Sequence, residues 1–492
     1  MGSKDNTEKK EEREIKGLTV KKSENFSEWY SQIVQKAELG DLRYNVKGFL
    51  VFQPWSVLCM EKMYYHFEKT LQKKGHQPYF FPTLIPEDNF QKETSHVKGF
   101  SPEVFWVTHG GNTKFNERLA LRPTSETAFY QLFSLWIRSY KDLPFKTYQR
   151  ANIFRYETKA TRPFLRSREV HWIETHCAFA SQEDAMKQVH EAMETTKEII
   201  HDIFGLPFIF FERPQWDKFP GAEKTFAADV LNPDGRVVQQ PSTHLIKQDF
   251  AKAFDIKFVD KKGEEKYVYT TCYGPAMSRL MASVAIVHGD DRGLRFPWEI
   301  APKNIVIVPI ELSSKVIGKT EELKNKIGDF ANVIIDMDKN KSIGEKFNYW
   351  DLKGVPVRID IGKEELKSGK LTVCRRDTDK KEIISEKDLM KYLEKVKRES
   401  GKNLREQADA LFNNRIKNVK SINEMKKVIS EGNIARCGFC SIAIDGEKCA
   451  EVIEKDVGAS VRGTNLKKEK ADGKCVICGK KAEHIVYIAR SY

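Results

Sequence analysis

The segment 121–176 constrains the fold of this chain more than any other stretch. Arg155 and Glu157 lie two residues apart, so on a strand both side chains would point to the same face of the sheet. The loop that follows is basic, and Pro163 disfavours a helical conformation at Arg162 before it. An arginine on a sheet surface followed by a basic loop can clamp a polyphosphate. On charge spacing alone, a solvated basic hairpin is an equally good interpretation.

Sequence resemblance favours the first interpretation. The run YQRANIFRYE at 148–157 resembles motif 2 of the class II aminoacyl-tRNA synthetases. The runs RPTSE at 122–126 and RSREVHWIETH at 166–176 resemble the prolyl-tRNA synthetases in particular, and the likeness covers nearly the whole chain. It implies a multidomain α/β and α+β protein with a class II antiparallel-sheet catalytic core. An α/β anticodon-binding domain and a small zinc-containing C-terminal α/β domain would follow.

Length and charge agree with several domains and an RNA partner. A chain of 492 residues suits about three domains, and a formal net charge of +13 suits a polyanionic partner. No apolar run approaches the ~20 residues that span a bilayer, and the N-terminus is charged. We therefore expect a cytoplasmic protein with no membrane partner. The expected parts are a charged tail at 1–17, a catalytic domain at 18–301, an anticodon-binding domain at 302–405 and a C-terminal zinc-binding domain at 406–492.

The loop at 124–126 offers one hydroxyl and one carboxylate after a rigid proline. Thr124 and Glu126 can hold a secondary ammonium group through charge-assisted hydrogen bonds. Ser125 and Glu126 could equally cap a following helix. In the prolyl family the matching loop binds the imino group of proline, and the resemblance carries this role to Thr124 and Glu126. It further implies a proline pocket walled by Trp172, Glu174, His176 and His244, with Arg155 on the carboxylate.

The same resemblance implies the nucleotide site and the catalytic groups. Arg155 would contact the α-phosphate, and Arg279 matches the motif 3 arginine that neutralises ATP. A buried guanidinium at the start of a helix needs an anionic partner, although a surface arginine is the commoner case for such a pattern. We predict Arg155 and Arg279 as the catalytic residues. The predicted ATP-binding set is Arg155, Glu157, Arg166, Gln239, Ser242 and Arg279, with Mg²⁺ bound near Gln239.

Three positions depart from the family pattern. Gln240 and Pro241 replace a pair of glycines, and a proline fixes φ and removes an N–H. Met277 stands where many relatives have a hydroxyl, and Val170 stands where the cytosolic eukaryotic enzymes tend to have phenylalanine. We expect an altered backbone in the first case and an altered pocket lining at Val170.

Five of the nine cysteines cluster near the end of the chain, which in a cytosolic protein indicates a metal site before disulfides. Cys475 and Cys478 form a CxxC knuckle, half of a zinc site. For the other half, Cys437 and Cys440 have ribbon-like spacing, whereas Cys440 with Cys449 resembles the archaeal and eukaryotic prolyl enzymes. We predict structural Zn²⁺ on Cys440, Cys449, Cys475 and Cys478, with Cys437 as the alternative ligand. Five reduced cysteines without a metal remain the other interpretation.

Two further regions carry predictions about partners. A helical stripe at 57–74 and a strand at 79–81 resemble motif 1, which forms the dimer interface in the family, so we expect a homodimer. Alternating strands and helices over 305–377 predict an α/β domain with a mixed sheet. The candidates for RNA contact there are Lys353, Arg358, Arg375 and Arg376.

The resemblance implies an ATP-dependent ligase that forms prolyl-adenylate from L-proline and transfers the prolyl group to the 3′ end of tRNA-Pro. No side chain need act as an obligatory base. Only about a hundred residues separate the motif 2 loop from Cys272, so we expect no editing domain of the bacterial type and no hydrolysis of Ala-tRNA.

Two alternatives remain open. A class IIa enzyme for threonine or histidine would share the motifs, and a non-catalytic paralogue that only binds tRNA would be expected to have lost Arg155, Glu157 or Arg279.

Overall fold

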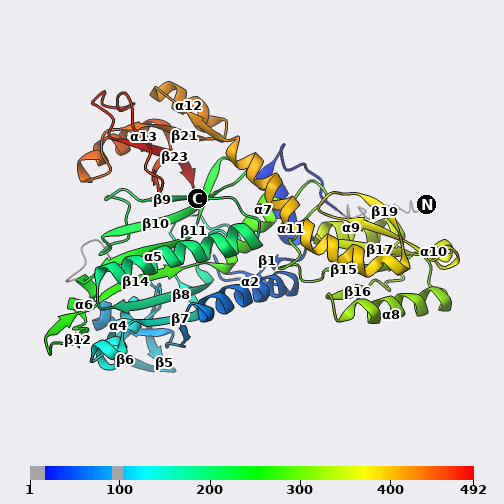
Figure 1. Ribbon diagram of the computed structural model, residues 1–492, viewed down its shortest axis with the longest axis horizontal. Coiled ribbons are helices and arrows are strands. Elements are labelled where there is room, and N and C mark those ends of the chain that lie inside the picture. Colours follow the sequence, from blue (N-terminus) through cyan, green and yellow to red (C-terminus); the bar gives the residue numbers. More distant parts are fainter. Residues whose placement is uncertain (1–16, 91–102, 159) are drawn as a thin grey trace, which may run out of the picture.

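The computed structural model describes residues 17–90, 103–158 and 160–492 (Figure 1). Apart from Gly17, the predicted charged tail lies outside the described residues. A large sheet forms one end of the molecule and a smaller α/β unit forms the other, with the long helix α11 (Leu389–Asn413) running between them (Figure 1). Within the described residues, no helix combines the length and the apolar character needed to cross a membrane.

Among the described residues, eleven strands join into the large sheet. Its antiparallel centre consists of β10 (Lys224–Leu231), β11 (Arg236–Lys247), β14 (Tyr269–Gly274), β8 (Glu169–Phe179) and β7 (Phe145–Phe154). One edge is β3 (Gln77–Pro78), and the other side continues through β9 (Ile209–Glu212), β22 (Ser460–Asn465), β23 (His484–Ser491), β21 (Ile434–Phe439) and β20 (Ile416–Asn418). The sheet centre confirms the predicted class II catalytic core.

Helices cover the sheet because their apolar stripes need burial. The helices α1 (Phe26–Lys36), α2 (Pro54–Lys73), α5 (Gln182–Thr196) and α7 (Met277–His288) share one hydrophobic core with β8. Fully buried Ile33, Met63 and Leu280 lie in this core. A seven-residue π-helix, Lys197–Ile203, extends α5. Smaller elements of this part are β1 (Gly40–Asp41), β2 (Val51–Phe52), α6 (Asp249–Ala253), β12 (Lys257–Val259) and β13 (Glu265–Tyr267).

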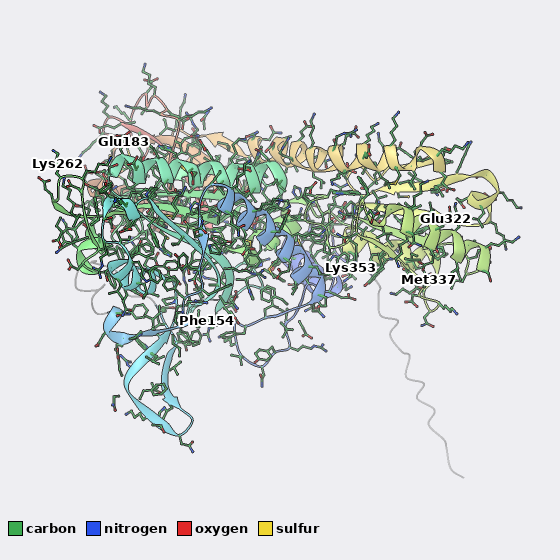
Figure 2. The ribbon with its side chains drawn as sticks, turned by 60° about the horizontal axis from the view of Figure 1, so that its bottom comes forward. Phe154, Glu183, Lys262, Glu322, Met337 and Lys353 are labelled. Atoms are coloured by element: carbon green, nitrogen blue, oxygen red, sulfur yellow. The ribbon has the colours of Figure 1, made fainter. Side chains whose placement is uncertain are left out.

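A second core lies around α4 (Glu126–Trp136), which begins directly after the Thr124 loop. Beside it, β4 (Leu84–Pro86), β5 (Trp106–Gly110) and β6 (Thr113–Leu121) form a three-stranded sheet. The β5–β6 hairpin projects from the body of the molecule (Figure 2). Gln149 and Ser125, from β7 and the α4 N-terminus, meet beneath the site described below.

The predicted α/β unit is present with a mixed sheet in the order β16–β15–β17–β18–β19. The first three strands are parallel and the last two pairings are antiparallel. The bounds are β15 (Ile305–Pro309), α8 (Ser314–Gly328), β16 (Val333–Ile335), α9 (Ile343–Lys353), β17 (Val357–Ile361), α10 (Lys363–Ser368), β18 (Lys370–Arg375) and β19 (Lys381–Ser385). Helix α9 shows its local signals clearly: Ser342 and Glu345 form a capping box, and left-handed Gly354 ends the helix.

The C-terminal strands continue the sheet of the catalytic core. Strand β22 pairs with β9 through Thr464 and Asn465, and β23 pairs in parallel with β11 at Arg236 and Val237. Helices α12 (Ile422–Ser430) and α13 (Glu447–Val457) pack on this extension. The last residues of the chain therefore lie beside the strands that carry Gln239 and Ser242.

Two strand predictions near the site differ from the structure. The strand predicted at 79–81 lies beyond the observed strand, because β3 ends at Pro78, and the Phe80 side chain is 86% exposed. Strand β7 ends at Phe154, so Arg155 and Glu157 do not share a strand face. The backbone N–H of Glu157 bonds the carbonyl of Arg155 at 2.8 Å, which turns the chain away from the sheet.

The four basic side chains predicted as RNA contacts all form ion pairs within the protein, and their contact with RNA stays a prediction. Lys353, Arg375 and Arg376 are buried, and Arg358 is partly buried. Their carboxylate partners are Glu38 for Lys353 (2.5 Å), Asp360 for Arg358 (2.9 Å), Asp377 for Arg375 (2.8 Å) and Asp290 for Arg376 (2.5 Å). Some of these carboxylates lie far from their partners in the sequence, so the charges near each basic residue did not indicate the ion pairs.

Candidate active site

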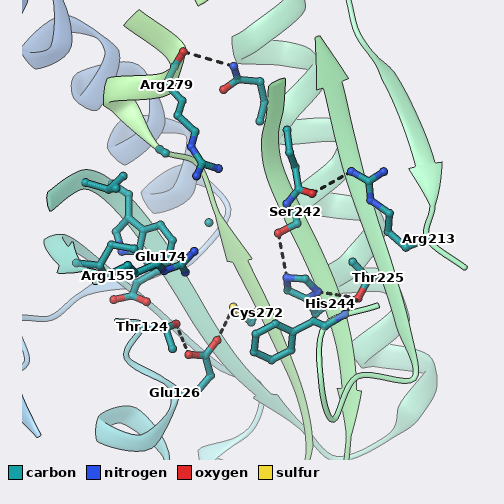
Figure 3. Close-up of a pocket in the computed structure, with 18 of the residues that line it drawn as sticks. Thr124, Glu126, Arg155, Glu174, Arg213, Thr225, Ser242, His244, Cys272 and Arg279 are labelled. Carbon is teal, nitrogen blue, oxygen red and sulfur yellow. Dashed lines mark hydrogen bonds between the residues drawn. The ribbon is translucent and has the colours of Figure 1, made fainter. Parts of the chain in front are cut away.

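A cavity of about 220 Å³ opens over the centre of the large sheet, between β7 and β8 on one side and β10 and β11 on the other (Figure 3). It brings together most residues of the predicted substrate site, although they come from five separate segments. The predicted residues that line it are Thr124, Glu126, Arg155, Trp172, Glu174, Gln239, Ser242, His244 and Arg279.

The floor of the cavity carries a buried carboxylate, Glu126, at the first position of α4. One of its oxygens accepts a hydrogen bond from the Thr124 hydroxyl, and the Cys272 thiol lies 3.3 Å from the other. Across the described chain, no lysine or arginine nitrogen lies at ion-pair distance from Glu126. A buried carboxylate without a cation is costly, so this floor suits a positively charged group of a ligand.

Ser125 precedes α4 but does not cap the helix through its side chain. Its hydroxyl donates instead to the buried carboxylate of Glu174, which also accepts from Gln149 Nε2 at 2.6 Å. Burial by itself raises the pKa of Glu174, but hydrogen bonds from His176, Ser125 and Gln149 hold that pKa below its ordinary value. Glu174 is therefore a fixed, ionised wall of the cavity.

His176 differs in placement from its expected role as a cavity wall. Its ring is fully buried, 4.4 Å from the ring of Phe129, and its Nε2 lies 3.2 Å from Glu174 Oε2. The alternation along β8 placed the side chain on the correct face, but the aromatic residues of α4 cover that end of the face. His176 thus supports Glu174 from behind.

Arg155 and Arg279 both line the cavity, from different parts of the sequence (Figure 3). Arg155 Nε donates to the carbonyl of Pro123 at 3.1 Å, and its guanidinium lies 5.5 Å from the centre of the Trp172 ring. Arg279 Nε donates to the carbonyl of Leu165 at 3.2 Å. Burial, together with the nearby charge of Arg155, lowers the pKa of Arg279 to about 10. Two neighbouring cations of this kind are best satisfied by an anion between them.

The opposite wall is held by His244 and its neighbours on β10 and β11. His244 Nε2 lies 3.0 Å from the Ser242 hydroxyl, and Nδ1 lies 3.0 Å from the Thr225 hydroxyl. Burial lowers the pKa of His244 to about 3, so the ring is neutral at pH 7. The ring of Phe219 covers the imidazole, with the two centres 4.7 Å apart. His244, Ser242 and Thr225 therefore offer neutral polar groups to the cavity.

The unusual Pro241 sits in a β-bulge. Ala227 pairs with Ser242 and Asp229 pairs with Gln239, so the two residues Gln240 and Pro241 lie opposite a single residue of β10. A bulge leaves a residue out of the ladder, which is where a strand tolerates proline. The extra residue lets both Gln239 and Ser242 reach the cavity.

The other two departures from the family pattern are apolar packing positions. Met277 is fully buried at the start of α7. Val170 packs with Ile153 and Ala276 at the cavity wall.

Glu157 and Arg166 lie outside the main cavity and pair with each other, with Arg166 Nε 3.0 Å from Glu157 Oε2. Arg166 faces an adjoining cavity of about 200 Å³, which shares Gln239 and Arg279 with the first. The C-terminal Tyr492 lines this second cavity. Of the predicted nucleotide residues, Glu157 lines neither cavity, whereas each of the others lines one or both.

Sequence reasoning missed Arg213, a fully buried cation at the end of β9 that lines the main cavity. Its Nη2 donates to Asp229 Oδ1 at 2.7 Å and to Gln239 Oε1 at 2.9 Å. One signal could have indicated it: Asp229 interrupts the apolar run 226–231, and a buried carboxylate predicts a cationic partner. The remaining lining residues that were not predicted include Asp217, Lys218, Phe219, Thr225 and Cys272.

The C-terminal cysteines form a second candidate site. The sulfur atoms of Cys440, Cys449, Cys475 and Cys478 all lie within 4.8 Å of one another. Cys437 belongs to β21 and is buried in the apolar core of this region, outside the group. Four thiols at the end of one strand, on one helix and in one turn match the donor set of a closed tetrahedral zinc site.

An antiparallel sheet that gathers a buried carboxylate and two arginines over its centre has the arrangement of a class II tRNA synthetase core. Residues 105–288 match the family model of the tRNA synthetase class II core domain (G, H, P, S and T). Residues 304–396 match the anticodon binding domain, and residues 422–492 match the prolyl-tRNA synthetase C-terminal domain. Together with the similarities given next, these matches show that the chain belongs to the prolyl-tRNA synthetase family.

Curated relatives and solved structures agree on this family. The proline–tRNA ligase of Thermofilum pendens is 46% identical over 97% of this chain and 99% of the relative, and that of Methanopyrus kandleri is 41% identical over 95% and 96%. The structure of Giardia lamblia prolyl-tRNA synthetase in complex with prolyl-adenylate has a TM-score of 0.91, with 39% identity over 96% of this chain and 99% of that one. The Cryptosporidium parvum enzyme complexed with halofuginone and AMPPNP has a TM-score of 0.90, with 30% identity over 97% and 100%.

Proposed function

We propose that this chain joins L-proline to ATP as prolyl-adenylate, with release of pyrophosphate, and then transfers the prolyl group to the 3′ end of tRNA-Pro. One observation carries the proposal. No lysine or arginine nitrogen among the described residues lies at ion-pair distance from the buried carboxylate of Glu126, which shares a cavity with the guanidiniums of Arg155 and Arg279. A small amino acid with a positively charged imino group, joined through its carboxyl group to a phosphate, satisfies both ends of such a cavity.

Thr124 and Glu126 bind the imino group of proline, and Arg155 binds its carboxylate. The walls are Trp172, Glu174 and the neutral ring of His244, with His176 holding Glu174 in place. Arg155 and Arg279 then stabilise the charge that builds up at the α-phosphate as the carboxylate attacks. Because the pKa of His244 is about 3, its ring does not charge near neutral pH. Catalysis rests on alignment and on fixed charge.

Glu157, Arg166, Gln239 and Ser242 bind the remainder of the nucleotide. Arg166 and Arg279 face the adjoining cavity, which offers room for the leaving pyrophosphate. Magnesium favours oxygen ligands, and the Gln239 amide oxygen keeps a lone pair beyond its bond to Arg213. When bound, the ion would neutralise phosphate charge. The cavity residues supply the positioning.

The amino-acid specificity is tested by ATP–pyrophosphate exchange with a panel of amino acids. We expect proline to support exchange roughly 100-fold faster than threonine, histidine or alanine, because the Glu126 side chain at the floor and a small walled pocket select a compact imino acid. Exchange with threonine or histidine in place of proline would identify the sister class IIa enzyme. No exchange with any amino acid would identify the tRNA-binding paralogue, which the presence of Arg155, Glu157 and Arg279 argues against.

We further propose that Cys440, Cys449, Cys475 and Cys478 bind one structural zinc ion, since four thiolates leave no open position. Purified protein should contain about one zinc per chain by elemental analysis. Cys475→Ser should lose the zinc and lower the Tm, whereas Cys437→Ser should retain it, because Cys437 lies outside the sulfur cluster. Loss of zinc from Cys437→Ser would refute this ligand set, and zinc-free wild-type protein would refute the metal site.

We also propose a homodimer through α2 and the chain after β3. Large apolar side chains are exposed there, and the most exposed is Phe80 at 86%. The exposed large apolar side chains of α2 are Val57, Leu58 and Tyr65. Exposed apolar groups of this size favour a protein partner.

Phe80→Asp should convert a dimer into a monomer in light scattering coupled to gel filtration, because a charge would be buried at the interface. Ile383→Asp is the matched control, since that side chain is 70% exposed on β19. If the Phe80→Asp variant is still a dimer, the interface lies elsewhere. The same conclusion follows if only the Ile383→Asp variant is a monomer.

The remaining proposals concern organisation and location. We retain a catalytic domain at 18–301, an anticodon-binding domain at 302–405 and a C-terminal zinc-binding domain at 406–492. The family matches at 304–396 and 422–492 fall within the last two. As a translation enzyme, the chain would act in the cytoplasm.

A further inference from the structure

A single buried carboxylate joins the C-terminal region to the catalytic core. Asp229 of β10 is fully buried and accepts hydrogen bonds from two guanidiniums. Arg213 Nη2 lies 2.7 Å from Oδ1, and Arg462 Nε lies 2.7 Å from Oδ2. Arg213 belongs to the catalytic part of the chain, whereas Arg462 comes from β22 at its C-terminal end.

The same arginine extends the contact to a residue of the cavity. Arg213 donates from Nη2 to Gln239 Oε1 at 2.9 Å and from Nη1 to the backbone carbonyl of Arg462 at 2.7 Å. Gln239 lines both cavities, and Arg462 lines the second. Arg462, Asp229, Arg213 and Gln239 therefore form a continuous row of charge-assisted hydrogen bonds that ends at the nucleotide side of the site.

A glycine allows β22 to come close enough for this contact. Gly463 has a φ of 127°, and a Cβ atom there would lie 2.2 Å from the carbonyl oxygen of Glu212 on β9. No side chain fits in that space. The neighbouring Arg462 is thereby held with its guanidinium against Asp229.

The row of hydrogen bonds also orients the Gln239 amide. Because its oxygen accepts from Arg213, the amide –NH₂ group is free to donate to an anionic oxygen in the cavity. An amide that could rotate freely would offer oxygen and nitrogen in turn and would bind phosphate less well. Residues that hydrogen-bond to a ligand-contacting group from behind commonly orient that group and so affect the affinity for the ligand.

We propose that Arg462 is a positioning residue for ATP binding: acting through Asp229 and Arg213, it fixes the Gln239 amide as a hydrogen-bond donor to the nucleotide. The C-terminal region thus completes the nucleotide site as well as extending the sheet. This proposal rests on the ATP-dependent function proposed above.

The test is the KM for ATP of Arg462→Met in proline-dependent ATP–pyrophosphate exchange. Removing Arg462 leaves Arg213 and Asp229 as a one-to-one ion pair, so no buried charge is left uncompensated. We expect the KM for ATP to rise about tenfold, with the KM for proline within about twofold of wild type. Arg436→Met is the matched control, because Arg436 lies in the same C-terminal sheet but pairs with Glu469 at 2.6 Å.

A double variant separates positioning from a general loss of structure. In a Gln239→Ala background, Arg462→Met should change the KM for ATP by less than about twofold, because the residue through which it acts is gone. Additive effects, an unchanged KM in Arg462→Met, or an equal rise in Arg436→Met would each overturn the proposal. If Arg462→Met does not fold, Arg462→Lys, which keeps the charge but not the two-pronged contact, serves in its place. If the wild-type enzyme is active and one of these results is obtained, only the role of Arg462 is refuted. If the wild-type enzyme is inactive, the proposed function is refuted.

Discussion

Arg155→Ala is expected to reduce proline-dependent ATP–pyrophosphate exchange by roughly 10³-fold. Arg155 is held by Pro123 and Trp172 so that its guanidinium faces the cavity beside Arg279. Burial lowers the pKa of Arg155, and nearby carboxylates oppose that change. The group stays charged at neutral pH, and its interaction with phosphate is weakly screened. Removing it takes away an interaction that strengthens as charge develops at the α-phosphate.

The measurement for Arg155→Ala is the rate of exchange at saturating proline and ATP, which isolates kcat from binding. Arg118→Ala is a suitable control, because Arg118 lies on the projecting β5–β6 hairpin and pairs there with Glu87. Near-normal exchange by Arg155→Ala would remove Arg155 from the catalytic site. A comparable loss in Arg118→Ala would show that the assay reports folding rather than chemistry.

Glu126→Gln is expected to raise the KM for proline by about 10- to 100-fold, the loss that follows when a charged hydrogen bond is removed. The glutamine keeps the size and the bond to Thr124 but cannot balance the positive imino group. The KM for ATP should change little, because the nucleotide residues lie on the other walls and in the adjoining cavity. This split between the two KM values distinguishes a lost proline contact from a disturbed site.

The control for Glu126→Gln is Glu117→Gln, on β6, where the carboxylate accepts from the backbone N–H of Asp88 at 2.9 Å in an exposed position. An unchanged KM for proline in Glu126→Gln would contradict the assignment of the cavity floor. So would equal changes in the KM values for proline and ATP.

Regular elements and short motifs could be predicted from local sequence. The stripe of apolar residues that predicts a helix over 57–74 corresponds to α2, and the capping signals of α9 lie within a few residues of its ends. The predicted mixed sheet of the smaller α/β unit is present. Alternation and capping act over one or two turns of chain, so the residues that specify these features are neighbours in the sequence.

The placement of Glu157, which follows β7, and of His176, inside β8, could not be predicted in this way. Glu157 leaves the strand face because the chain turns after Phe154, and His176 recedes because the rings of α4 occupy its side of the sheet. Both outcomes depend on what packs against the strand. The sequence of the strand by itself does not specify which side chains pack against it.

The sequence alone determined the family-defining segments, the helices and strands that hold them, and the cysteine-rich end of the chain. The tertiary structure decided which cysteine stands apart from the sulfur cluster, since β21 directs Cys437 into the core. It also decided that Asp229 and Arg462, 233 residues apart, meet behind Gln239. A buried charge is stable only beside an opposite charge. The folded sheet decides which residues lie next to each other, so the two partners need not be close in the sequence.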